Sequence, residues 1–181
     1  VTDMAGLFMM DVNISTLDLS NFDTSQVRDM SSMFSGMDAL SNLNLSSFNT
    51  QKVKDMTEMF GETGADKMIA INLGKFDMNN VDHLPNILDT TPLRITLGPN
   101  TRLTLDETYV DEHGDLVQPQ PAGLDTFSKD EPHNGDWYTG KWFDTKTHQV
   151  YNTDQLVALY ATIGNNPAAT YQQQTNLEVK D

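Results

Sequence analysis

The chain has 181 residues and a formal net charge of −15, from 11 basic and 26 acidic side chains. This length suits one ordinary domain or two small ones. The acidic balance argues against nucleic acid as a partner, because few cations are present to displace the counterions of a phosphate backbone. The absence of cysteine excludes disulfides, Cys-ligated zinc and a cysteine nucleophile. No apolar run approaches the roughly 18 residues that span a bilayer, so we expect no membrane insertion.

The N-terminal half consists of copies of one unit. The copies begin at Leu17, Leu43, Ile71 and Ile95, with spacings of 26, 28 and 24 residues, and the last copy soon departs from the pattern. Residues 1–8 (VTDMAGLF) match residues 27–34 (VRDMSSMF), so the chain starts in mid-repeat, and we expect it to be a fragment of a longer protein. A unit this short cannot bury an apolar face alone, so neighbouring units must stack and share one core.

Equivalent positions of the copies form apolar columns. The columns include Leu17, Leu43, Ile71 and Ile95; Phe22, Phe48 and Phe76; Met4, Met30, Met56 and Leu84; Leu7, Met33, Met59 and Ile87; and Phe8, Phe34, Phe60 and Leu88. We interpret the methionines as core residues, since unbranched side chains fill irregular gaps. A Met-rich groove for a partner is the alternative, but the exchange of Met for Leu and Ile in the third copy favours the core.

Each unit has the pattern of a strand, a turn and a short helix. The L-x-L triplet alternates as a strand does, with both leucines on one side. Met30, Met33 and Phe34 follow helical spacing, which predicts a short helix over residues 29–36 with Asp29 as a candidate cap. The expected fold is therefore an α/β leucine-rich-repeat solenoid over residues 1–97, with a short parallel strand and a short helix in each repeat.

The segments at residues 17–34 (LDLSNFDTSQVRDMSSMF) and 43–60 (LNLSSFNTQKVKDMTEMF) resemble the BspA-like leucine-rich repeat of lactobacillal, enterococcal, listerial and mycoplasmal surface proteins. The period, L-x-L, Phe, Val and D-M-x-x-M-F all agree over two full copies. The third copy departs at residues 83–85 (HLP), where we expect a distorted helix. The resemblance implies an exported protein at the cell surface or cell wall of a Gram-positive type bacterium, active in adhesion and host interaction, without a catalytic residue.

In such an architecture the middle residue of each L-x-L faces outward. That row is Asp18, Asn44, Asn72 and Thr96. We take it as a candidate ligand-binding surface for a glycan or an extended peptide. The alternative is a solvated sheet face, because no aromatic residue stands in the row to stack on a sugar. A second polar column holds Asp3, Asp29 and Asp55, and helix capping explains it more simply than a row of cations does.

Residues 98–181 lose the repeat period and are expected to form a small β-rich α+β cap region. Residues 102–117 alternate around Glu112-His113-Gly114, which predicts a hairpin. A helix is expected near 153–161, capped by Asn152 or Thr153, and a final strand is expected over 170–179. The aromatic residues Trp137, Tyr138 and Trp142, with Tyr151 nearby, are a candidate ligand platform; the alternative is the core of the cap.

No motif for catalysis, a cofactor or a metal is present. The four histidines lack metal-helix spacing, and no nucleophile elbow, P-loop or dinucleotide fingerprint occurs. An acid cluster between Asp106 and Asp115 could bind Ca²⁺ but lacks the usual loop spacing, so a solvated hairpin tip is the simpler interpretation.

Two functions compete. The first is a non-catalytic binding module of a bacterial adhesin that recognises host extracellular matrix protein, mucin, another glycan or other cells. The second is a structural spacer that projects other modules from the cell wall. An uncapped first repeat also predicts end-to-end self-association, since its apolar face lacks a neighbour.

Overall fold

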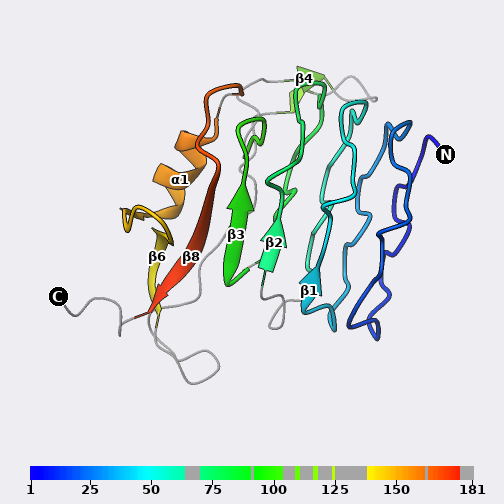
Figure 1. Ribbon diagram of the computed structural model, residues 1–181. Coiled ribbons are helices and arrows are strands. Elements are labelled where there is room, and N and C mark those ends of the chain that lie inside the picture. The colour runs from blue at the N-terminus through cyan, green and yellow to red at the C-terminus, as the bar shows by residue number, and fades with distance from the viewer. Residues whose placement is uncertain are drawn as a thin grey trace.

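The structure is a computed structural model that describes residues 1–63, 70–90, 92–103, 109–110, 116–117, 124, 138–161 and 163–175. Its centre is a six-stranded mixed sheet in the order β1-β2-β3-β8-β6-β7, seen face-on in Figure 1. The strands are β1 (Asn42–Leu43), β2 (Ala70–Asn72), β3 (Arg94–Leu97), β6 (Tyr138–Asp144), β7 (Val150–Tyr151) and β8 (Ala169–Thr175). A separate antiparallel pair joins β4 (Tyr109–Val110) to β5 (Leu116–Val117), on either side of the expected hairpin turn. The helix α1 spans Thr153–Leu159.

The repeats and the C-terminal half share the six-stranded sheet. Strands β1, β2 and β3 come from successive repeats and pair in parallel, with Leu43, Ile71 and Ile95 in register. Strand β8 then adds antiparallel to β3, placing Tyr171 opposite Ile95, and β6 and β7 follow. The expected boundary at residue 97 lies at the end of β3, so the sheet continues from one predicted domain into the other.

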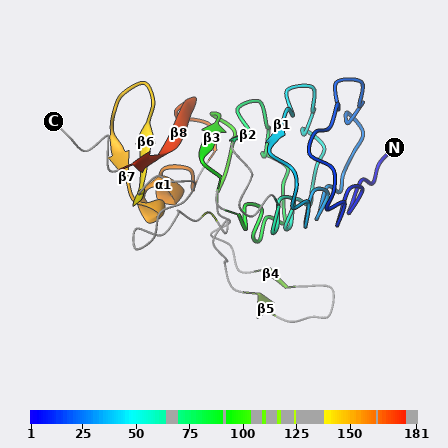
Figure 2. The same ribbon diagram turned by 90° about the horizontal axis from the view of Figure 1, so that it is seen from below.

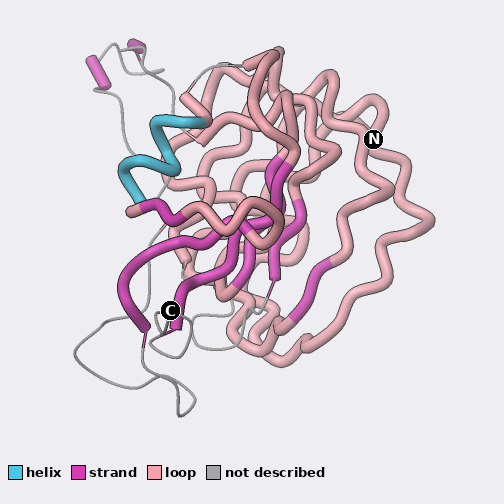
Figure 3. The backbone as a smooth tube through the Cα atoms, turned by 60° about the vertical axis from the view of Figure 1, so that its left-hand side comes forward, coloured by secondary structure: helices cyan, strands magenta, loops and turns pink. Residues whose placement is uncertain are grey.

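The predicted fold class is wrong. In its described part the chain forms one six-stranded mixed sheet, the small β4–β5 pair and one short helix, rather than an α/β leucine-rich-repeat solenoid with a helix in every repeat and a separate cap. The segment expected to be helical, residues 29–36, is a run of turns, and Figure 3 shows how little of the described backbone is helix. An isolated helix of eight residues is marginal in water, so another backbone arrangement that buries the same side chains can replace it.

These turn segments bond to one another across repeats. Within a repeat, turns close through bonds such as Met33 N–H to the Met30 carbonyl (3.3 Å) and Ser35 N–H to the Ser32 carbonyl (3.0 Å). Alternate N–H groups point to the next repeat instead. Met4, Gly6, Phe8 and Met10 donate to Asp29, Ser31, Met33 and Ser35, and Met30, Ser32, Phe34 and Gly36 donate to Asp55, Thr57, Met59 and Gly61. Every repeat is therefore held to its neighbour by main-chain bonds.

The turns require left-handed backbone at fixed positions. Ser32, Glu58 and Asn86 occupy one such column, with φ of 52°, 51° and 52°, and Gly6 precedes them at 59°. Gly36 occupies the other at φ 69°, where a Cβ would also lie 2.5 Å from the sulfur of Met10. Only glycine adopts this conformation without steric cost, so the non-glycine residues in these columns are held there by the bonds between repeats.

The predicted apolar columns form the core. Met30, Met33, Phe34, Met56 and Phe60 are completely buried. The rings of Phe8, Phe34 and Phe60 stack in line, each 5.7 Å from the next with interplanar angles of 9° and 10°. The first repeat is only half covered, because nothing described lies beyond it: Leu7 is 47% exposed and Met10 is 61% exposed.

Buried threonines also join the repeats, and they were not predicted from the sequence. Thr24 donates its hydroxyl to the carbonyl of Asn49 at 3.0 Å and accepts the Asn49 N–H at 2.8 Å. Thr50 makes the same pair of bonds with Asp77, at 3.0 and 2.8 Å. Each hydroxyl satisfies both main-chain polar groups of one residue in the neighbouring repeat, which meets the need for buried backbone groups to be paired.

The C-terminal half covers the end of the repeat core. Asn152 is the N-cap of α1, forming a capping box with Gln155. Figure 2 shows α1 on the same side of the sheet as the turn segments of the repeats. Its Leu156 is buried there, and the hydroxyl of Tyr160 donates to the carbonyl of Pro167 at 2.6 Å and lies 3.1 Å from the hydroxyl of Tyr171.

Candidate functional site

The face of the six-stranded sheet turned away from the core, here called the outward face, carries the predicted row of polar residues. Asp18, Asn44 and Asn72 are exposed on it, and Thr96 is partly covered. The next strands extend the row, because Thr170 of β8 pairs with Thr96 and the backbone N–H of Thr145 donates to the Thr170 carbonyl at 3.0 Å. The structure therefore brings the four predicted repeat residues into one line that continues into the C-terminal half.

The side chains of this row are held in place by their own turns. The Oδ1 atoms of Asp18, Asn44 and Asn72 each accept the backbone N–H two residues further on, all at 3.0 Å. This leaves the Nδ2 groups of both asparagines as fixed donors toward solvent. The hydroxyl and backbone N–H of Ser20 lower the pKa of Asp18, so its carboxylate is an acceptor at neutral pH.

A second row on the outward face carries charge and an aromatic ring. Arg94 donates to the side-chain oxygen of Gln172 at 2.8 Å across the β3–β8 pair. Gln172 in turn stands opposite Phe143 of β6, whose ring stacks on His148 at 5.4 Å. Phe143 was not predicted to lie on this face, because the antiparallel pairing of β8 with β3 and β6 brings it there.

Of the predicted aromatic platform of Trp137, Tyr138 and Trp142, the structure describes the side chain of Trp142 alone. Trp142 is completely buried on the opposite side of β6, and its indole N–H donates to the hydroxyl of Thr153 at 3.2 Å. This placement agrees with the core alternative for that residue. Tyr138 begins β6, but its side chain is outside the described part, as is the whole of Trp137.

A hollow of about 330 Å³ opens where the repeats meet the C-terminal half. It is lined by Gly74, Thr96, Leu97, Thr145, Lys146, Ala168, Ala169 and Thr170. Asp144 fixes the turn that carries Lys146, because its Oδ1 accepts the backbone N–H groups of Lys146 (2.8 Å) and Thr147 (3.1 Å). Burial opposes ionisation of Asp144, but these bonds and the Lys146 charge prevail and lower its pKa.

A second hollow, of about 430 Å³, lies between β7 and α1 and is mainly apolar. Tyr151, Val150 and Leu159 line it, together with Gln155, whose amide is already engaged in the capping box. The side-chain oxygen of Gln155 is thus committed to the fold.

The acidic column serves the turns. Asp29 and Asp55 accept the backbone N–H two residues on, at 2.9 and 2.8 Å, so they cap turns rather than the expected helices. The third repeat has Pro85 at the donor position, and since proline has no N–H, the acceptor is not needed at His83. Within the described residues, no group of three or more His, Asp or Glu side chains could hold a metal ion. The acid cluster between Asp106 and Asp115 lies outside them apart from the backbone of β4.

The chain is thus a protein whose short repeats are joined by main-chain bonds and whose sheet extends into a non-repeating half. Residues 1–93 match the family model described as "Mycoplasma protein of unknown function, DUF285". This match covers half of the chain, which therefore belongs to that family. No curated protein and no solved structure matches it. Among the described helices, none is long and apolar enough to cross a membrane.

Proposed function

We propose that the chain is a non-catalytic binding module of a bacterial cell-surface protein, and that its outward face attaches to host extracellular matrix protein, mucin or another glycan. The observation that carries this proposal is the line of fixed polar side chains across the sheet. Asn44 and Asn72 hold their Oδ1 atoms in turns and present their Nδ2 groups outward. Donors that are already ordered lose little entropy on binding, which favours recognition of polar ligands.

The extended form of the face supports a long ligand rather than a small one. The two asparagines lie on neighbouring repeats, and adjacent strands are spaced about 4.8 Å apart. Phe143 adds an aromatic surface at the far end of the same face, which suits a sugar ring or an apolar side chain. The likeness of the repeats to BspA-like surface proteins supports a location at the cell surface or cell wall.

The test is binding of the protein to immobilised mucin, fibronectin, collagen, laminin and glycans at physiological salt. The informative variants are Asn44→Asp and Asn72→Asp, because aspartate keeps the turn acceptor and removes the outward donor. We expect both to weaken a saturable interaction while the melting temperature stays unchanged. Asn49→Asp is the matched control, since Asn49 makes the same kind of turn bond to Gln51 away from the row, and Asp23 stands at the equivalent place in the preceding repeat.

A structural spacer is the second candidate, favoured by the continuity of the core. One buried cluster extends from Met4 in the first repeat to Tyr171 in β8. A unit joined in this way would transmit force between flanking modules. Absence of binding across the whole panel, with a cooperative unfolding transition, would contradict the binding proposal and favour the spacer.

A further inference from the structure

The hollow between the repeats and the C-terminal half has the size and chemistry of a site for one sugar unit. Its volume of about 330 Å³ is at the lower end of the roughly 300–1,000 Å³ usual for ligand sites. It lies at the junction of β3, β8 and the turn after β6, where the repeats meet the C-terminal half. A ligand held there would contact both halves of the chain and continue along the outward face.

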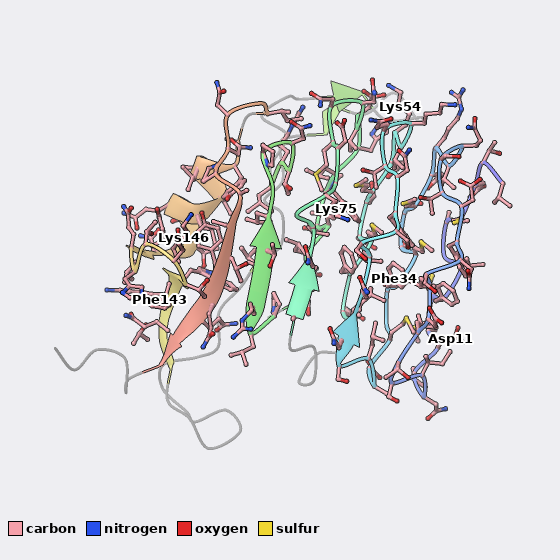
Figure 4. The ribbon with its side chains drawn as sticks, viewed as in Figure 1. Asp11, Phe34, Lys54, Lys75, Phe143 and Lys146 are labelled. Atoms are coloured by element: carbon pink, nitrogen blue, oxygen red, sulfur yellow. The ribbon has the colours of Figure 1, made fainter. Side chains whose placement is uncertain are left out.

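Its lining is unusual for so acidic a chain. The formal net charge is −15, but the lining contains Lys146 and no carboxylate. The ammonium group of Lys146 forms no ion pair with the carboxylates of the described residues, whereas Lys54 is paired with Asp82 at 3.0 Å. In Figure 4, Lys146 lies on the β6 side of the sheet and Lys75, which follows the lining residue Gly74, lies on the β2 side.

Three hydroxyls accompany this cation. Thr96 and Thr170 are 3.0 Å apart through their Oγ1 atoms, and Thr145 donates its hydroxyl to the carbonyl of Thr170 at 3.1 Å. The Asp144 carboxyl holds the backbone of Lys146 but is itself buried beneath the turn. The hollow therefore offers one ammonium donor, three hydroxyl oxygens as acceptors, the one hydroxyl proton that the Thr96–Thr170 pair leaves free, and the small surfaces of Gly74 and Ala169.

We propose that this hollow binds an acidic sugar unit, with Lys146 contacting its carboxylate or sulfate group and Thr96, Thr145 and Thr170 contacting its hydroxyls. A single anionic group matches the single lysine of the lining. Charge-assisted hydrogen bonds to the anion supply most of the affinity. This inference rests on the proposed glycan-binding function and specifies its ligand class.

The test is titration of the protein with glucuronate, a sulfated glucose and neutral glucose, followed by NMR chemical shifts. We expect dissociation constants on the order of 1 mM for one or both acids and no saturation with glucose. Lys146→Gln should weaken acid binding at least about tenfold, and Lys146→Arg should restore most of it. Lys52→Gln is the matched control, because Lys52 bonds to Gln26 on the surface of the repeats.

The outcomes separate this inference from the proposed function. Preference for glucuronate would identify a carboxylate site, and preference for the sulfated sugar a sulfate site. Equal binding by the protein and its Lys146→Gln variant, or saturation with neither acid, would overturn the inference. If mucin or matrix binding then persisted and still depended on Asn44 and Asn72, the proposed function would stand without the acidic-sugar site.

Discussion

Replacement of Phe34 by alanine tests whether the repeats are held together as the structure describes. Phe34 is completely buried, stacked between Phe8 and Phe60 at 5.7 Å on each side, with Phe48 tilted against it at 6.4 Å. Truncation of a buried phenylalanine costs about 3–5 kcal/mol, and loss of two stacked contacts places this site toward the upper end. The expected loss is a large fraction of the roughly 5–15 kcal/mol that stabilises an ordinary domain.

Phe8→Ala is the internal comparison. Phe8 occupies the same column but is only half-buried and stacks on one side, against Phe34, so its truncation should cost about 1–2 kcal/mol. Urea unfolding followed by circular dichroism gives both free energies, with the m-value reporting whether the transition stays two-state. Equal losses for the two variants, or a smaller loss for Phe34→Ala, would refute a continuous stacked core.

Three further predictions concern backbone and titration. Glu58 has left-handed backbone, so Glu58→Gly should raise the free energy of unfolding by about 1 kcal/mol. Asp89, whose N–H donates to the Asn86 carbonyl in the next repeat, is the comparison, and Asp89→Gly should lower that free energy. Thermal melts compare the two variants. Gly98→Ala should destabilise by about 1–3 kcal/mol in the same assay, because its Cβ would overlap the Gly74 carbonyl oxygen. Burial and the hydrogen bond to Tyr171 raise the pKa of Tyr160 above the unfolded value of about 10. The stability that neutral Tyr160 contributes is therefore complete below that pH and is lost as the pH rises further. Alkaline absorbance titration should show the phenols of Tyr160 and Tyr171 ionising only with unfolding.

Apolar periodicity was sufficient to predict the core of the repeats but not their backbone. Met30, Met33 and Phe34 share one side in a helix and also in the observed turns, because the i→i+3 bonds of the turns place side chains at similar spacing. Glycine at positions 6 and 36 is a sequence feature that indicates left-handed backbone. In later repeats the position of Gly6 is taken by Ser32 and Glu58, which give no such indication. Bonds to the neighbouring repeat overrode local helix preference, and such bonds are not visible in a single unit.

The candidate site was predictable in part for the same reason. The row of Asp18, Asn44 and Asn72 follows from the L-x-L pattern alone. Lys146 and Phe143 could not be assigned to the same face, because their position depends on β8 pairing with β3 across a large separation in sequence. Threonine recurs at positions 24 and 50 of the sequence, but the role of its hydroxyl depends on a main-chain carbonyl of the next repeat.

The direction of the bonds between repeats gives the stack an electrical polarity. Successive peptide groups of an ordinary β-strand alternate in direction, so their dipoles largely cancel. In the turn segments, by contrast, the peptides that carry the N–H groups of Met30, Ser32, Phe34 and Gly36 all direct the N–H toward the C-terminal neighbour and the carbonyl toward the N-terminal one. These dipoles add along the stack, as they do in a helix, and give each repeat a partly negative carbonyl side and a partly positive N–H side. Two copies that met carbonyl side to carbonyl side would oppose like poles, so any association along the stack should proceed head to tail, and a partner on the carbonyl side of a repeat must bring hydrogen-bond donors.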